Sequence, residues 1–303
     1  MNFISITDLN REQILGILAR AKDVKYGNLT KSLNELTFGL LFEKPSLRTK
    51  VSFQVGIQQL GGYSIYLGPD EVGLGKRETI EDIATVLSSY VHGIVARVNS
   101  HSSLIEMAEY SKVPVVNALS DEEHPCQVIA DLLTISENKP ISPKTKVTFV
   151  GDGNNVSRSL ALLCASVGMS FSIATPKGYE LDQDTQNQCK IMAQKSGSDL
   201  LFSNDVMEVV QNSDVVYTDA WTSMGQEEEA DKRRRDFEGF SVNEELLRLA
   251  AENVIFMHDM PVHYGEEVPT GMLKSTPSVA YEQAYNRLPA QQAILESLYT
   301  GLG

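Results

Sequence analysis

Strand-like and helix-like segments alternate along almost the whole chain, and this alternation limits the possible folds more than any other feature of the sequence. Short apolar runs that resemble buried strands are each followed by a stretch with apolar residues at helical spacing. The expected strands are residues 36–42, 63–67, 93–98 and 113–119 in the first half, and 146–150, 170–175, 199–203, 214–218 and 254–257 in the second. Successive units of this kind predict parallel sheets with helices on both faces.

The alternation is interrupted once, at residues 137–144, where two prolines stand among polar residues. We therefore expect an α/β protein of two doubly wound parallel-sheet domains, residues 1–138 and 145–279. A further helix is expected at the end of the chain, from about residue 281 to residue 299. In such sheets ligands bind at the carboxyl ends of the strands, so polar residues there are the candidate site residues.

Composition is that of a globular protein, since 42% of the 303 residues are hydrophobic and 22% are charged. Two domains of this size can each bury a core. No apolar run reaches the length of a membrane span, and the N-terminus lacks a signal pattern, so we expect a soluble cytoplasmic protein. The widely spaced cysteines Cys126, Cys164 and Cys189 fit neither a disulfide framework nor a metal cluster and favour a reducing compartment.

The net charge is strongly negative: 26 basic minus 40 acidic residues gives −14. This charge argues against nucleic acid and against anionic membranes as partners. An anionic substrate would need a local basic pocket, and the positions of a few arginines then matter most.

Residues 46–49 combine two hydroxyls and a guanidinium where a strand passes into a helix. Free backbone N–H groups and the positive end of the helix dipole lie at such a junction. Ser46, Arg48 and Thr49 could therefore hold a phosphate or carboxylate, with Leu47 contributing only its backbone. The simpler alternative is an ordinary N-cap by Ser46 and a surface arginine.

Two further polar groups follow strands of the first half. Arg97 ends an apolar strand, where an unpaired charge is costly to bury, so it should face either a ligand or a structural ion pair. His124 and Gln127 open the helix after the next strand and could offer an imidazole and an amide to one small ligand. Cys126 between them is interpreted as a small buried residue and not as a nucleophile.

In the second half, Gly151 and Gly153 stand between a strand and a helix, as in a dinucleotide-binding turn. The third glycine of that motif is replaced by Val156, so the motif is incomplete. The side-chain amides of Asn154 and Asn155 would suit the carboxylate and amine of an amino acid.

Two other turns carry polar residues at strand ends. The segment 219–225, with Asp219 at its start, suits recognition of a cationic amine. The acidic run 226–229 is interpreted as a solvated helix start. Asp259 lies in the segment 258–261, which follows the last expected strand.

Taken together, these motifs resemble the ornithine carbamoyltransferases, over essentially the whole chain and in the order of that family. The motifs are Ser46-Leu47-Arg48-Thr49, His124-Pro125-Cys126-Gln127, Asp219-Ala220-Trp221-Thr222-Ser223-Met224-Gly225, His258-Asp259-Met260-Pro261 and Glu282-Gln283-Ala284-Tyr285-Asn286-Arg287. The first two are similar to carbamoyltransferases in general. The loop with Ser223 and Met224 resembles the ornithine branch more specifically.

The resemblance implies a carbamoyl phosphate-binding first domain and an ornithine-binding second domain, with the C-terminal helix, about residues 280–303, returning to the first domain. It implies the formation of L-citrulline and phosphate, a reaction of arginine biosynthesis, without metal or other cofactor. It also implies homotrimers, or multiples of trimers, with active sites between subunits.

The site residues follow from the same resemblance. Carbamoyl phosphate would contact Ser46, Leu47, Arg48, Thr49, Arg97, His124, Gln127 and Arg287. Ornithine would contact Asn155, Asp219, Ser223 and Met224, and the catalytic residues would be Arg97, His124 and Asp259. Cationic donors at the carbonyl oxygen would stabilise the charge that develops when an amine attacks carbamoyl phosphate.

Three residues depart from the family pattern. Leu47 stands where the family usually has Thr, and Lys50 replaces a common Arg. Asp259 stands where the family usually has Cys, and a carboxylate there could hold the cationic amine and accept its proton. This last departure leaves a second function open, carbamoyl transfer to another amine such as putrescine or a modified ornithine. A nucleotide-binding oxidoreductase or binding module that uses the 151–155 turn is the third alternative.

Overall fold

The computed structural model describes residues 1–75, 77–222, 225 and 227–300. It divides into two compact units, residues 1–133 with 286–303, and residues 134–285. Both units are built on parallel sheets, which confirms the predicted fold class. In the part of the chain that the structure describes, no helix is both long and apolar enough to cross a membrane.

The sheet of the first unit has four parallel strands in the order β2-β1-β3-β4. Their bounds are β1 Thr37–Phe42, β2 Tyr63–Leu67, β3 Gly93–Arg97 and β4 Val115–Leu119. The register pairs Phe42 with Arg97 and Arg97 with Leu119, so three strands end side by side. This shared edge is where polar residues of distant sequence segments can meet.

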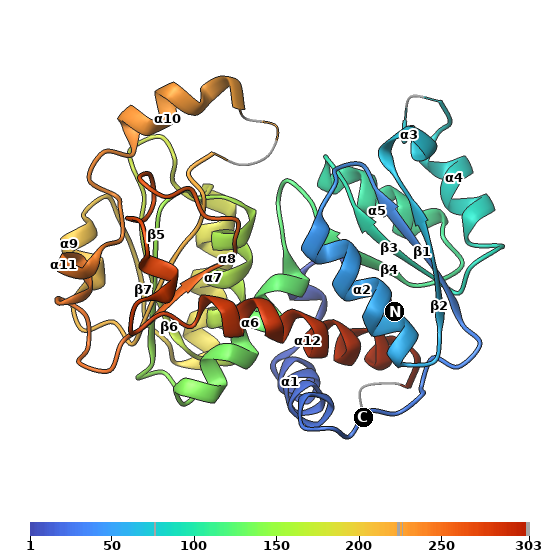
Figure 1. The fold of residues 1–303 in the computed structure, drawn as a ribbon, viewed down its shortest axis with the longest axis horizontal. Coiled ribbons are helices and arrows are strands. Elements are labelled where there is room, and N and C mark those ends of the chain that lie inside the picture. The colour runs from blue at the N-terminus through green and yellow to red at the C-terminus, as the bar shows by residue number, and fades with distance from the viewer. Residues whose placement is uncertain (76, 223–224, 226, 301–303) are drawn as a thin grey trace. The chain divides into compact units, whose positions relative to one another are not determined.

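Helices cover both faces of this sheet (Figure 1). They are α1 Arg11–Lys25, α2 Leu47–Gln59, α3 Pro69–Val72, α4 Ile80–Leu87, α5 His101–Tyr110, α6 Pro125–Asn138 and α12 Ala280–Thr300, with a short 3-10 turn at Ile6–Asp8. Helices α4 and α5 pack together on one face. On the other face α12 is tied to α1 by Arg20 and Glu296, 2.7 Å apart, and to α2 by Gln292 and Gln59, 2.9 Å apart.

The core of the first unit lies between the sheet and these helices. It is built mainly from aliphatic residues, and one cluster contains Ile4, Leu41, Val72, Leu74, Ala84, Val91, Ile94, Ala96, Val98, Leu104, Met107 and Val115. Burial of such side chains is the main favourable term in folding and holds the strand ends in place.

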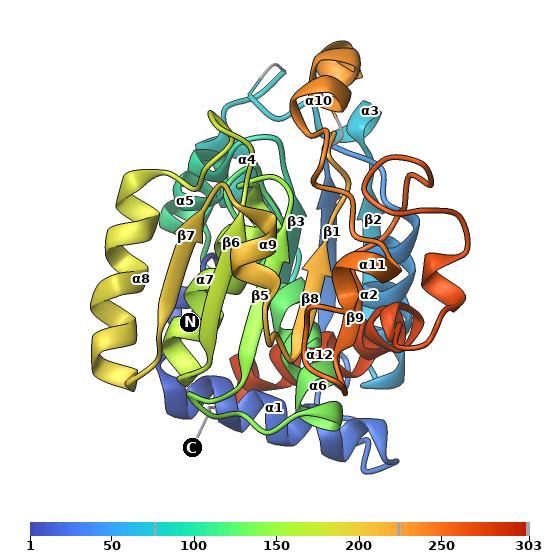
Figure 2. The same cartoon turned by 90° about the vertical axis from the view of Figure 1, so that its left-hand side faces the viewer.

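The second unit has five parallel strands in the order β7-β6-β5-β8-β9 (Figure 2). Their bounds are β5 Lys146–Val150, β6 Ser170–Ala174, β7 Leu200–Ser203, β8 Val215–Thr218 and β9 Ile255–His258. The helices are α7 Asn155–Val167, α8 Gln183–Ser196, α9 Val206–Val210, α10 Ala230–Asp236 and α11 Glu244–Leu247, with 3-10 turns at Glu227–Glu229 and Met272–Lys274. The chain order reverses between β5 and β8, so α7 and α8 lie on one face and α9 and α11 on the other.

The last helix, α12, runs across the boundary between the two units. Residues up to Tyr285 belong to the second unit, whereas residues from Asn286 onward belong to the first. The expectation that the C-terminal helix returns to the first domain is therefore confirmed.

All nine predicted strands are present, and two helices of the described residues, α1 and α3, were not predicted. Helix α1 carries an apolar stripe and is capped by Asn10, so a signal for it existed. Helix α3 spans only one turn and begins at Pro69. Helix α10 follows the acidic run interpreted as a solvated helix start, and the residue on its buried side is an arginine, Arg233.

Candidate functional site

The start of α2 carries the first candidate group. Ser46 is the N-cap, and its Oγ accepts a hydrogen bond from the backbone N–H of Thr49 over 3.4 Å. The Ser46 hydroxyl also donates to Oγ1 of Thr49 over 3.0 Å. Arg48 is half-buried and Leu47 is 79% exposed. The simple capping interpretation is thus correct for Ser46, and the cap leaves the other N–H groups of the first turn facing outward from the helix end.

Arg287 of α12 joins this group from the far end of the chain. Its Nη2 donates to Oγ1 of Thr49 over 2.7 Å, and both side chains are buried. Arg97 at the end of β3 and His124 just before α6 are buried in the same unit. Two guanidinium groups, a hydroxyl and a helix N-terminus are the donors that proteins use for phosphate and carboxylate groups.

His124 is electrostatically coupled to both arginines. Burial lowers its pKa well below the ordinary value, and the positive charges of Arg287 and Arg97 lower it further. The imidazole is therefore neutral near pH 7. A neutral imidazole can donate one hydrogen bond to a carbonyl oxygen without adding a third positive charge to the cluster.

Gln127 and Cys126 follow His124 on α6, and both are buried. The side-chain amide of Gln127 donates to Asp131 over 2.8 Å, which fixes its orientation. The Cys126 thiol donates to the carbonyl oxygen of Asn117, and burial raises its pKa to about 12. Such a thiol carries almost no thiolate at neutral pH and is unsuited to nucleophilic attack.

The candidate residues of the second unit begin with Asn154 and Asn155. Asn154 is the N-cap of α7, and its Oδ1 accepts from the N–H groups of Val156 and Ser157. Its Nδ2 donates to Oδ2 of Asp219 over 3.0 Å. Both polar atoms of Asn154 are thus engaged in the fold, whereas Asn155 is the half-buried first residue of the helix.

Asp219 follows β8 and Asp259 follows β9, and the two carboxylates influence each other. Burial raises the pKa of Asp219 to about 7, with a further contribution from the negative charge of Asp259. The hydrogen bonds from Asn154 and from the Ala220 N–H act in the opposite direction. Two neighbouring carboxylates of this kind are suited to binding a cation such as an ammonium group.

A buried imidazole shapes the turn that carries Asp259. His258 Nδ1 accepts from the N–H of Met260 over 2.8 Å, so its proton lies on Nε2, which donates to Glu267 over 3.1 Å. Met260 has a φ of +59°, a backbone conformation that residues other than Gly, Asn and Asp adopt with strain. The hydrogen bond to His258 compensates for this strain and fixes the direction in which Asp259 leaves the sheet. Sequence reasoning did not identify Glu267.

The glycines of the 151–155 turn serve packing. Gly151 has a φ of +146°, which strongly favours glycine. A Cβ at Gly153 would lie 2.6 Å from backbone atoms of residues 179–181. The backbone of this turn therefore requires both glycines for its conformation and packing, and a bound nucleotide is not needed to explain them. This agrees with the incomplete motif.

Ser223 and Met224, which the resemblance assigned to ornithine, lie outside the described residues. Within the described part of the chain, His263, Glu266 and Glu267 bring three ligand atoms within 4.8 Å of one another, a grouping that sequence spacing did not indicate. Glu266 is already paired with Arg234 over 2.9 Å, and Glu267 with His258. We assign no metal to this group.

Comparisons with known proteins identify the family of the chain. The family model described as the aspartate/ornithine carbamoyltransferase carbamoyl-P binding domain matches residues 1–137, and the model of the Asp/Orn binding domain matches residues 143–298. The ornithine carbamoyltransferase of Caldicellulosiruptor saccharolyticus is 44% identical over 298 residues, 97% of each chain. That of Methanosphaera stadtmanae is 44% identical over 299 residues, 98% of this chain and 99% of the relative. The solved structure of ornithine carbamoyltransferase from Pyrococcus furiosus has a TM-score of 0.94 at 42% identity, covering 99% of this chain and 97% of that one.

Proposed function

The chain belongs to the aspartate/ornithine carbamoyltransferase family, and we propose that it transfers the carbamoyl group of carbamoyl phosphate to the side-chain amine of L-ornithine. The products are L-citrulline and phosphate, formed in a step of arginine biosynthesis. The neighbouring positions of Asp219 and Asp259, which directly follow the paired residues Thr218 and His258 of β8 and β9, carry this proposal. Two carboxylates at this edge attract the cationic side chain of ornithine and repel the anionic side chain of aspartate.

In this proposal carbamoyl phosphate binds to the residues of the first unit. The phosphate accepts hydrogen bonds from Ser46, Arg48 and Thr49 and from the backbone N–H of Leu47 in the first turn of α2. Arg287 supports this contact through Thr49 and adds its own positive charge.

Arg97, His124 and Gln127 bind the carbamoyl group. Arg97 and the neutral His124 donate to the carbonyl oxygen, on which negative charge develops during attack. Gln127, oriented by Asp131, presents its amide oxygen to the carbamoyl NH₂.

Ornithine binds to the residues of the second unit. Asn155 contacts the amino-acid end, and Asp219, Ser223 and Met224 contact the same substrate, in line with the family resemblance. Asp259 aligns the attacking amine and accepts its first proton, because an ammonium with a pKa of roughly 10 must be deprotonated before it can attack.

The chemical step needs no further group. The amine nitrogen forms a bond to the carbamoyl carbon, the bond from that carbon to the phosphate oxygen breaks, and phosphate leaves with the electron pair. The second amine proton passes to the departing phosphate. Two bound substrates held in line supply much of the rate, because the reaction becomes effectively unimolecular.

A homotrimer, or a multiple of trimers, is part of the same proposal. The edge strand β2 exposes Tyr63 and Ile65, and the neighbouring α2 exposes Leu47 and Val51. Exposed apolar side chains on an open sheet edge are typical of a surface that another chain covers. Sedimentation of the purified protein tests the subunit number.

A panel of acceptor amines tests the reaction itself. The purified protein is incubated with carbamoyl phosphate and L-ornithine, putrescine, L-lysine or L-aspartate, and the products are identified by mass. We expect citrulline from ornithine at a kcat/KM far above that of the other amines. If carbamoyl-putrescine were the main product, putrescine would replace ornithine as the acceptor. This alternative is tested because Asp259 departs from the family pattern. Carbamoyl-aspartate would overturn the argument from the two carboxylates.

A further inference from the structure

Arg233 is a buried arginine of α10 whose contacts reach two different loops of the second unit. Its Nη1 lies 2.6 Å from Oδ2 of Asp152 and 2.8 Å from the carbonyl oxygen of Trp221. Its Nε lies 3.3 Å from Oε2 of Glu229, one helical turn earlier. A single nitrogen thus donates both to the turn between β5 and α7 and to the loop that follows β8.

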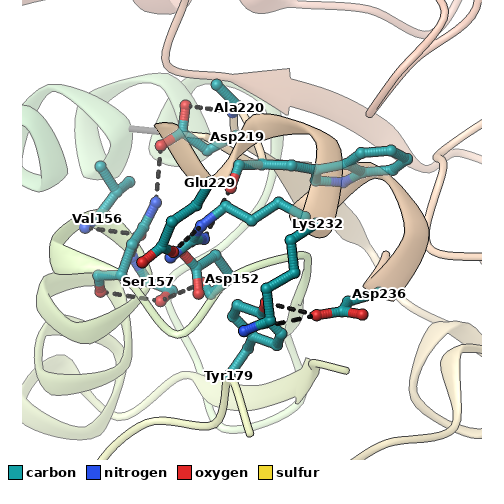
Figure 3. A network of polar contacts seen from close by, with 12 residues as sticks. Asp152, Val156, Ser157, Tyr179, Asp219, Ala220, Glu229, Lys232 and Asp236 are labelled. Atoms are coloured by element: carbon teal, nitrogen blue, oxygen red, sulfur yellow. Dashed lines mark hydrogen bonds and ion pairs between the residues drawn. The ribbon is translucent and has the colours of Figure 1, made fainter. Parts of the chain in front are cut away.

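Aromatic rings hold the guanidinium in this position. Its central carbon lies 5.0 Å from the ring centre of Tyr179 and 6.0 Å from that of Phe237. Tyr179 is itself fixed by a 2.7 Å hydrogen bond to Asp236 at the end of α10 (Figure 3). Stacking on these rings restricts Arg233 to the geometry in which it can serve both loops.

The same two loops are joined a second time, through Asn154 and Asp219. Asp152 and Asn154 are two residues apart on one loop, and Asp219 and Trp221 are two residues apart on the other. The contacts therefore form a closed ring, in which Asp152 and Asp219 lie on facing segments beside Glu229 (Figure 3). Asn155 continues the first loop into α7, and Asp219 starts the second.

We propose that Arg233 is a positioning residue for the amino-acid substrate. It holds the loop of Asn155 and the loop of Asp219 at the spacing that allows Asn155 and Asp219 to bind the same ornithine molecule. This inference rests on the proposed function. Arg233 acts through the loops, since its Nη1 donates to Asp152 and Trp221 and its Nε donates to Glu229.

The charges of this ring explain why an arginine is needed. Asp152 and Glu229 neutralise the guanidinium, so no net positive charge opposes the substrate ammonium at Asp219. Without Arg233, the carboxylate of Asp152 would be left buried and unpaired, which is strongly unfavourable. The loop would then rearrange to hydrate it. A lysine offers a single point of charge and cannot hold two acceptors in a fixed fork.

Arg233→Met, Arg233→Lys and the double variant Arg233→Met/Asp152→Asn test the proposal, with Arg235→Met as the matched control. Arg235 is an exposed arginine two residues further along α10 and loses the same charge. For each variant, KM and kcat for ornithine are measured at saturating carbamoyl phosphate, together with the carbamoyl phosphate Kd by calorimetry and the Tm.

We expect Arg233→Met to raise the KM for ornithine at least about tenfold, because misplacing one binding group is costly. Its carbamoyl phosphate Kd should stay within about twofold of the wild-type value, and Arg233→Lys should give an intermediate KM. The double variant Arg233→Met/Asp152→Asn should keep the high KM, because the tie to Trp221 is still absent. Arg235→Met should resemble the wild type in every measurement.

Three results would overturn the proposal. The first is an unchanged ornithine KM in Arg233→Met, and the second is a wild-type ornithine KM in the double variant. The third is a carbamoyl phosphate affinity of Arg233→Met that falls by the same factor as its ornithine KM rises. If Arg233→Met does not fold, Arg233→Lys decides by the same KM measurement. Failure of the wild type to form citrulline would instead contradict the proposed function, whatever the variants do.

Discussion

Thr49 accepts a hydrogen bond from Arg287 across 238 positions of the sequence, with 2.7 Å between Nη2 and Oγ1. The contact joins the first turn of α2 to α12 within the first unit. It places a guanidinium beside the helix N-terminus that we propose as the phosphate site, and it makes phosphate binding depend on the last helix of the chain.

The Thr49 contact can be tested with two variants that differ by one group. Thr49→Val removes the hydroxyl and should weaken carbamoyl phosphate binding about 5–10-fold, the usual net effect of one hydrogen bond. Thr49→Ser keeps the hydroxyl and should change the affinity by no more than about twofold. Calorimetry measures both. Equal affinities for the two variants would show that the hydroxyl does not matter.

Arg48 should contribute more than Thr49, because it would pair directly with a dianionic phosphate. Arg48→Ala should weaken carbamoyl phosphate binding by roughly 2–4 kcal/mol. Lys50→Ala serves as the control, because it removes the same positive charge two residues away. The Lys50 side chain lies over the ring of Tyr66. If both variants lose equal affinity, the effect is one of general charge and the assignment of Arg48 is wrong.

Cys126 should be dispensable. Its thiol is buried, donates to a backbone carbonyl and has a pKa raised to about 12, so it is neither exposed nor ionised. Cys126→Ser should keep most of the activity and Cys126→Ala should differ mainly in Tm, through a small cavity. Loss of several orders of magnitude in kcat with an unchanged Tm would contradict this and identify the thiol as catalytic.

The fold could be predicted from the sequence because the signals for it are local. Each strand is a short apolar run, and each long helix after it carries an apolar stripe. For helix α10 only an acidic start was predicted. Its buried residue is Arg233, and a pattern of apolar residues cannot reveal how far a helix extends when an ion pair and aromatic stacking hold it. Helix α1 was overlooked although its stripe is regular.

The site could be predicted only in part, for a related reason. Residues at strand ends, such as Arg97, Asp219 and Asp259, follow from the rule for parallel sheets. Their partners do not, because contacts such as Asp152 with Arg233 or His258 with Glu267 depend on tertiary packing. Asn154 shows the limit most clearly: its amide looked like a ligand, but it caps α7 and holds Asp219.

The raised pKa of Asp219 predicts a pH dependence of stability. Its value of about 7 in the folded protein lies above the ordinary 3.8, so the folded chain binds more protons than the unfolded chain between these limits. The free energy of unfolding should therefore fall as pH rises from about 4 to 7 and then level off. Asp219→Asn should lack this fall in thermal melts.

Ornithine binding should show the opposite trend, because the ammonium group binds the ionised carboxylate. We expect the KM for ornithine to decrease as pH rises through about 7 and the Asp219→Asn variant to lose this step. A wild-type KM that does not change between pH 6 and 8 would show that Asp219 is already ionised, or that it does not contact the amine.

Asp259 should act on the attacking amine, because it follows β9 next to Asp219 and leaves the sheet in a direction fixed by His258 and Met260. Asp259→Asn keeps the size of the side chain and removes the proton acceptor, so it should lower kcat with ornithine while the fold and carbamoyl phosphate Kd are unchanged. Asp259→Cys introduces the residue usual in the family and should recover part of the rate, since a thiolate can also accept a proton. A residue that merely shapes the turn would tolerate Asn, because its amide can make the same turn hydrogen bonds. Normal kcat and KM in Asp259→Asn would therefore remove Asp259 from the proposed mechanism, and the proton would then pass to Asp219.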